Sequence, residues 1–138
     1  MGSTNYYNTL IEVAEDSKYE TGELPPIKVG KVSVANLQFD MVYENPYKYT
    51  SDDVLYTVFA VRKEIPPGEL QEQRDVFFSK GQPCFRASPL TKSYGWGLHS
   101  NAEGKVALYA VESEEYDKLV NDDAIKKTKA MRTKKVSK

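Results

Sequence analysis

Apolar residues recur along this chain at two periods, which divide it into predicted strands and predicted helices. Residues 6–14 are rich in aromatic and β-branched residues, and Thr9, Ile11 and Val13 alternate with polar neighbours. This period of two predicts a strand. Charged residues, glycines and a pair of prolines then predict a long exposed loop over residues 15–30.

The same period predicts three further strands in the second half of the chain. Residues 94–100 and 105–112 are separated by the turn-forming segment 101–104, and we expect them to form an antiparallel hairpin. Residues 83–87 are short and bounded by turn residues, so they are a candidate for another strand.

Residues 34–44 fit both periods. Read at period two, the segment has one apolar strand face, and read at helical spacing Val34 and Leu37 lie one turn apart. We favour a helix, because Ser33 is a suitable N-cap and Pro46 is a suitable stop.

Most of the other predicted helices begin after side chains that accept hydrogen bonds from free backbone amides. They cover residues 51–62 after Thr50, residues 69–79 after the break at 66–68, a short segment after Ser113 and another after Asp122 or Asp123. The resulting order, β-ααα-βββ-αα, predicts an α+β fold with helices packed on a mostly antiparallel sheet of about four strands.

The composition is that of an ordinary globular protein. The chain has 138 residues, of which 40% are hydrophobic and 28% charged, and we expect one α+β domain over residues 4–131. A single cysteine excludes an internal disulfide bond. The absence of a signal peptide and of an apolar run long enough to cross a membrane predicts a soluble, cytoplasmic protein without a membrane partner.

Positive charge is concentrated at the C-terminus, although the net charge of the chain is only −1. Residues 132–138 are expected to form a basic, flexible tail, and association with nucleic acid through it is one functional alternative. We regard nucleic acid as an unlikely partner, because no aromatic residues are interleaved with the lysines. The sequence contains no feature that fixes an oligomeric state.

Residues 79–100 contain the chain's only cysteine, tryptophan and histidine, together with several cations and glycines. We expect a small anionic or aromatic ligand, or a protein partner, to bind there without catalysis. The candidate ligand-binding residues are Lys80 and Arg86 for an anion, Lys92 as a further cation, and Tyr94 and Trp96 for stacking on a ring.

The main alternative is an enzyme or redox-sensitive protein. In that reading Cys84 is the nucleophile and His99 its base, with the Cys84 thiol activated by the nearby Arg86. The more common role of each residue is structural, with Cys84 in the core and His99 satisfied at the end of a strand. One histidine and one cysteine are too few for a usual zinc site, so we expect no metal, and no motif indicates a cofactor.

Four runs of the chain resemble a family of small, uncharacterised bacterial proteins, a domain of unknown function that covers nearly the whole sequence. The runs are NPYKYTSDD (45–53), FSKGQPCFRASPL (78–90), YGWGLHS (94–100) and VESEEY (111–116). The resemblance implies a single-domain cytosolic protein, and it implies no reaction, cofactor or partner.

Overall fold

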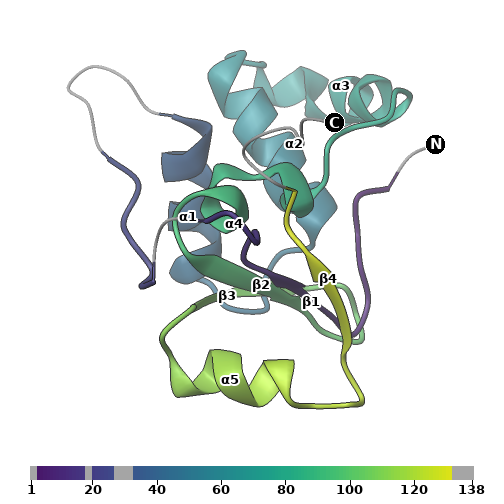
Figure 1. Cartoon of the computed structure of the whole chain (residues 1–138). Helices are drawn as coiled ribbons and strands as arrows, with labels where there is room; N and C mark the ends of the chain where they lie inside the picture. The colour runs from purple at the N-terminus through teal and green to yellow at the C-terminus, as the bar shows by residue number, and fades with distance from the viewer. Residues whose placement is uncertain (1–2, 18–19, 27–32, 132–138) are drawn as a thin grey trace, which may run out of the picture.

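The structure, a computed structural model, describes residues 3–17, 20–26 and 33–131 and has an α+β architecture (Figure 1). This confirms the predicted fold class. Its elements are β1 (Thr9–Glu12), α1 (Val34–Tyr43), α2 (Ser51–Arg62), α3 (Leu70–Phe78), α4 (Pro89–Lys92), β2 (Trp96–Ser100), β3 (Val106–Ala110), α5 (Glu114–Val120) and β4 (Lys126–Lys129), with 3-10 turns at Pro67–Glu69 and Phe85–Ala87.

The four strands form one mixed sheet in the order β3-β2-β1-β4. The β2–β3 hairpin and the β1–β2 pair are antiparallel, whereas β4 runs parallel to β1. Neighbouring residues Leu10 and Ile11 of β1 point to opposite faces of the sheet, and both are 0% exposed. The sheet is therefore covered on both faces at its central strand.

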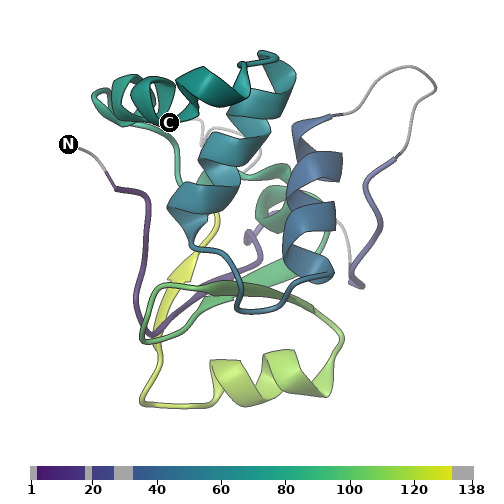
Figure 2. The ribbon, with the colours of Figure 1, turned by 180° about the vertical axis from the view of Figure 1, so that it is seen from behind.

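The helices cover the two faces unequally (Figures 1 and 2). Helices α1, α2 and α4 lie over one face, α5 lies over the other, and α3 lies beyond α2. The main core fills the space under α1, α2 and α4, and its fully buried members include Ile11, Val42, Val54, Phe85, Leu90 and Leu98. Burial of this apolar surface is the main source of stability of the fold.

Capping interactions explain why residues 34–44 form a helix rather than a strand. The Ser33 hydroxyl accepts a hydrogen bond from the Asn36 amide, and the Asn36 side chain accepts one from the Ser33 amide in return. Thr50 and Asp53 form the same reciprocal arrangement at the start of α2. The predicted helix and its predicted N-cap are thus both confirmed.

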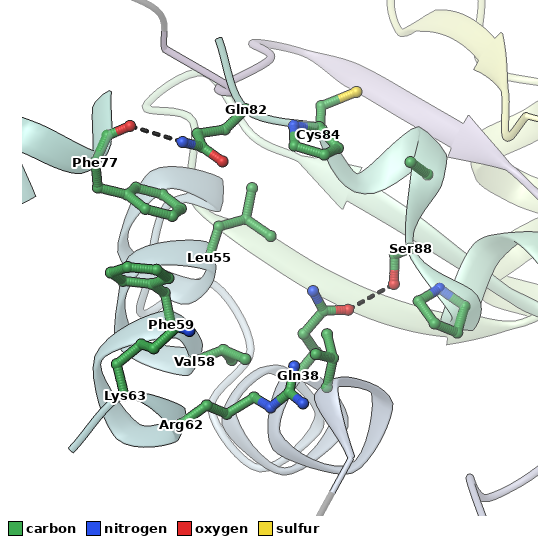
Figure 3. Close-up of a pocket in the computed structure, with 14 residues that line it drawn as sticks. Gln38, Leu55, Val58, Phe59, Arg62, Lys63, Phe77, Gln82, Cys84 and Ser88 are labelled. Carbon is green, nitrogen blue, oxygen red and sulfur yellow. Dashed lines mark hydrogen bonds between the residues drawn. The ribbon is translucent and has the colours of Figure 1, made fainter. Parts of the chain in front are cut away.

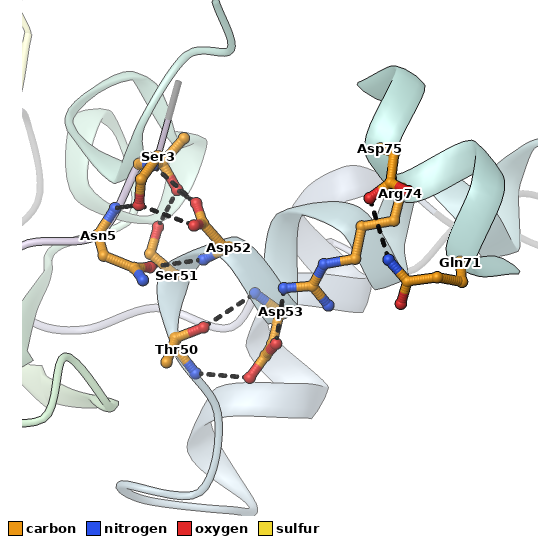
Figure 4. A network of polar contacts seen from close by, with 10 residues as sticks. Ser3, Asn5, Thr50, Ser51, Asp52, Asp53, Gln71, Arg74 and Asp75 are labelled. Atoms are coloured by element: carbon orange, nitrogen blue, oxygen red, sulfur yellow. Dashed lines mark hydrogen bonds and ion pairs between the residues drawn. The ribbon is translucent and has the colours of Figure 1, made fainter. Parts of the chain in front are cut away.

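The first turn of α2 also fastens two other segments in place (Figure 4). Asp52 accepts hydrogen bonds from the Ser3 hydroxyl and from the Thr4 amide, each at 2.7 Å, which holds the N-terminal segment against α2. Asp53 forms an ion pair with Arg74 at 3.0 Å, which holds α3 beside α2.

The predicted strand over residues 83–87 is wrong. Phe85–Ala87 form a 3-10 turn, and the short helix α4 follows after the N-cap Ser88. Pro83 has no amide proton for a strand ladder, and the Phe85 carbonyl accepts a hydrogen bond from the Thr91 hydroxyl at 2.6 Å. These local bonds turn the chain so that the Phe85 ring enters the core.

The helix predicted after Asp122 or Asp123 is also wrong, because Lys126–Lys129 form the edge strand β4. The free edge of β1 offers unpaired backbone groups, and the Lys126 amide donates to the Asn8 carbonyl at 2.8 Å. Lys126 and Lys129 are exposed, and exposed lysines protect an edge strand against pairing with other chains. The predicted tail, residues 132–138, lies outside the described residues.

No helix in the described part of the chain is long and apolar enough to cross a membrane.

The contact between β2 and α5 predicts a large difference between two glycine substitutions. A Cβ on Gly97 would lie 2.4 Å from the Tyr116 ring, and the Tyr116 hydroxyl is held by the Val13 amide at 3.2 Å. Gly97→Ala is therefore expected to lower the free energy of unfolding by about 1–3 kcal/mol, measured by urea denaturation.

Gly81→Ala is the matched control, because a Cβ there would meet no atom within 4 Å. Its unfolding free energy should stay within about 0.5 kcal/mol of the wild-type value. Equal stability of the two variants would contradict the packing of α5 described above.

Candidate functional site

Trp96, the predicted stacking residue, belongs to the core. Its side chain is 6% exposed, and its ring packs edge-on against Phe39 at 5.2 Å and Tyr43 at 5.5 Å. The indole nitrogen donates to the Glu23 carbonyl at 2.9 Å. The ring is packed on its partners and presents no open face to a ligand.

The other candidates for ligand binding lie on separate elements. Lys80 is exposed after the end of α3, and Lys92 is half-buried at the end of α4. The half-buried Tyr94 is joined to the Glu23 amide through its backbone carbonyl at 2.8 Å. Arg86 donates through Nε to the Lys129 carbonyl at 2.7 Å and so fastens the end of β4. Residues 79–100 therefore do not form one continuous surface.

Cys84 is a free, half-buried thiol next to Tyr6. The Tyr6 hydroxyl lies 3.6 Å from the Cys84 Sγ. Burial and the contact with Cys84 raise the pKa of Tyr6, and the nearby Arg86 opposes part of that effect. This arrangement joins the N-terminal segment to the turn before α4.

His99 lies in a chain of hydrogen bonds with two tyrosines. The Tyr47 hydroxyl is 2.8 Å from His99 Nδ1 and 2.8 Å from the Tyr109 hydroxyl. Burial lowers the pKa of His99, and Asp122 opposes this effect. Burial and the bond to Tyr109 raise the pKa of Tyr47.

The structure does not bring Cys84 and His99 together. On strand β2, His99 and Gly97 share a face, and a Cβ on Gly97 would point at Tyr116 of α5. Cys84 lies instead on the side of the sheet covered by α1 and α2, where it lines a pocket. A cysteine nucleophile with His99 as its base finds no support in this geometry.

The pocket lies between α1, α2, the end of α3 and the segment that leads into α4, and we call it the α1–α2 pocket (Figure 3). Its volume is about 400 Å³, within the range of sites for small organic molecules. It is lined by Val34, Gln38, Leu55, Val58, Phe59, Arg62, Lys63, Phe77, Gln82, Pro83, Cys84, Ala87, Ser88 and Pro89.

One wall of the pocket is apolar and aromatic. Leu55 and Phe59 project from α2, and Phe77 from α3 packs against Phe59 with the ring centres 4.6 Å apart. On the opposite side the chain turns through residues 83–89. The Sγ of Cys84 points away from the pocket, so this residue contributes its backbone and Cβ rather than its thiol (Figure 3).

Gln38 is the buried polar group of the pocket. The residue is 3% exposed, and its Oε1 accepts a hydrogen bond from the Ser88 hydroxyl at 2.6 Å. Its Nε2 faces the pocket and has no hydrogen-bond partner among the described residues (Figure 3). An acceptor in the pocket could therefore bind this donor without breaking the bond to Ser88.

Arg62 and Lys63 give the pocket a positive rim. Both are exposed at the end of α2, and the Arg62 side chain reaches along the rim toward Gln38 (Figure 3). Neither residue forms an ion pair within the part of the chain that the structure describes. By contrast, Arg74 of α3 is paired with Asp53 of α2. No carboxylate is among the described residues that line the pocket, so the charge of Arg62 and Lys63 favours an anion there.

The sequence analysis did not predict Gln38, Arg62 or Lys63 as site residues, although the sequence contains one signal for Gln38. In the helix over 34–44, Gln38 occupies the same stripe as Val34 and Val42, which lie four positions to either side. A polar residue within an apolar stripe indicates a buried hydrogen bond or a site. Arg62 and Lys63 have no such signal, because a basic pair at the end of a helix is ordinary.

Within the described residues, no three side chains of His, Cys, Asp or Glu lie close enough together to share a metal ion.

The chain belongs to a family of unknown function, DUF6157, whose sequence profile matches residues 1–136. The predicted resemblance to a domain of unknown function that covers nearly the whole chain is thereby confirmed. No curated protein and no solved structure shows significant similarity to the chain.

The environment of His99 predicts a pH dependence of stability. Burial lowers the pKa of His99 in the folded protein below the ordinary value of about 6.5 that it has in the unfolded chain. Between these two pKa values the unfolded chain binds a proton at His99 and the folded protein does not. The contribution of His99 to stability is therefore complete above about pH 6.5 and is lost as the pH falls from there toward the pKa of the folded state.

Two measurements check this expectation. An NMR titration of the only histidine should give a pKa below about 6.5. The variant His99→Gln should lose less unfolding free energy than the wild type between about pH 7 and pH 5. A histidine pKa at or above the ordinary value would contradict the burial of His99.

Proposed function

We propose that this protein binds a small organic anion with an apolar body in the α1–α2 pocket, without transforming it. The observation that supports this most directly is the Gln38 carboxamide, which is 3% exposed and turns an unpartnered amide donor into the pocket. A polar group in such a position fixes the orientation of a ligand in an otherwise apolar site.

The charge of the rim supports an anionic ligand. Arg62 and Lys63 stand at the mouth of the pocket without a described acidic partner, and an incoming anion would not have to displace an ion pair to reach them. The wall of Leu55, Phe59 and Phe77 accounts for the apolar body. Ligand binding would bury this surface and so contribute the hydrophobic part of the affinity.

The proposed ligand belongs to the class expected from the sequence, a small anionic or aromatic molecule, but its site differs from the predicted region 79–100. Six residues of the predicted region line the pocket: Gln82, Pro83, Cys84, Ala87, Ser88 and Pro89. The five predicted ligand-binding residues, Lys80, Arg86, Lys92, Tyr94 and Trp96, are not among the lining residues. Most of the pocket comes from α1 and α2. We also propose that the protein acts in the bacterial cytoplasm. Its single cysteine, which excludes an internal disulfide bond, and the resemblance of its four sequence runs to bacterial proteins support this location.

Binding of a test compound to two charge-removal variants checks the proposal. Naphthylacetate, a bicyclic aromatic carboxylate, should bind the wild-type protein and shift the NMR signals of Gln38, Phe59 and Phe77. Arg62→Ala should weaken this binding about tenfold, because the anion loses a charge-assisted hydrogen bond.

Lys80→Ala is the matched control, because it removes an exposed cation that does not line the pocket. Its dissociation constant, measured by isothermal titration calorimetry, should equal that of the wild type. The proposal fails if naphthylacetate and related anions leave the pocket signals unchanged, or if both variants lose the same affinity.

A further inference from the structure

We infer that the anionic group of the ligand is a carboxylate, held between the Gln38 amide and the Arg62 guanidinium. This inference rests on the proposed function and names the chemical class that the α1–α2 pocket selects. It depends on which hydrogen-bond donors and acceptors face the cavity at its basic end.

The orientation of the Gln38 amide is fixed by Ser88. The Ser88 hydroxyl oxygen accepts a hydrogen bond from the Leu90 amide at 3.2 Å, because Ser88 is the N-cap of α4. Its proton is donated to Gln38 Oε1, at 2.6 Å. The nitrogen of Gln38 consequently faces the pocket and offers only donors, so the ligand group beside it must be an acceptor.

Three side chains at the basic end of the pocket are hydrogen-bond donors. Nε2 of Gln38, the guanidinium of Arg62 and the ammonium of Lys63 all donate. The carboxamide of Gln82 lies across the pocket beside Phe77, whose carbonyl accepts from its Nε2 at 2.7 Å. A cationic ligand head would meet repulsion at the basic end, and a neutral amide head would lack the attraction between opposite charges.

A carboxylate fits this donor set better than a phosphate does. Phosphate sites commonly use several free backbone amides at the start of a helix or in a glycine-rich loop. Here the helix that begins at the pocket, α4, has Pro89 at its first position and its Leu90 amide already bound to Ser88. One buried amide and one guanidinium fork match the two coplanar oxygens of a carboxylate.

The depth of Gln38 sets the direction of the ligand. Because Gln38 is 3% exposed while Arg62 is exposed, the carboxylate lies where the buried wall meets the rim. The apolar body then extends toward Phe59 and Phe77, which stand on the opposite side of the pocket (Figure 3). Flat or branched hydrocarbon bodies that fill about 400 Å³ suit this space.

A series of ligands with one body and different head groups tests the inference. The probes are naphthylacetate, naphthylmethylphosphonate, naphthylacetamide and naphthylmethylamine, each titrated by calorimetry into the full chain. We expect naphthylacetate to bind at least about tenfold more tightly than each of the other three.

Substitution of Gln38 tests the residue itself. Gln38→Glu keeps an oxygen to accept from Ser88 but replaces the donor with a like charge, so it should weaken naphthylacetate binding about a hundredfold. It should leave naphthylacetamide binding nearly unchanged. Gln38→Met removes the donor without adding a charge, and it should weaken naphthylacetate binding about tenfold. This variant tests the residue if Gln38→Glu does not fold.

The outcomes separate the inference from the proposed function. Tightest binding of the phosphonate would overturn the carboxylate and leave the anion pocket standing. Equal binding of acetate and acetamide would overturn the carboxylate and the anionic class, although a pocket for apolar molecules would remain. Absence of binding by all four probes would overturn the proposed function as well.

Discussion

The fold depends on the pairing of β1 with a neighbour on each side. This four-residue strand joins the β2–β3 hairpin to β4, and its residues Leu10 and Ile11 are fully buried on opposite faces of the sheet. Segments from the two ends of the chain therefore meet at one strand, and α1, α2 and α4 have a surface on which to pack. Without this strand the hairpin would be a two-stranded unit, which is marginally stable by itself in water.

Elements of the fold that depend on local hydrogen bonds could be predicted from the sequence, whereas elements that depend on distant segments could not. Helices α1 and α2 are bounded by N-cap residues whose bonds involve neighbours three positions away, so their sequences contain the necessary information. Strand β4 has no such signal, because its three lysines and one threonine acquire their conformation from the free edge of β1, more than 110 residues earlier in the chain. Tertiary pairing here overrides local preference.

The candidate site was predicted less well than the fold for a related reason. Scarce residues drew attention to residues 79–100, but the chain uses Trp96 to fill the space between α1 and the sheet, and it uses Arg86 to fasten the end of β4. The pocket is instead formed where α1, α2 and the turn before α4 meet, from residues of ordinary types. A site built from common side chains is defined by packing, which a single sequence does not display.

The Gln38–Ser88 bond links the stability of the fold to its proposed use. Ser88 caps α4 and at the same time orients Gln38 of α1, so one hydroxyl holds two elements of the core in register. This bond satisfies the Oε1 atom of Gln38 and leaves its Nε2 facing the pocket. An acceptor in the pocket would therefore bind Gln38 without breaking the bond that holds α1 to α4. Because such a ligand binds only the folded chain, its binding would add to the stability of the fold.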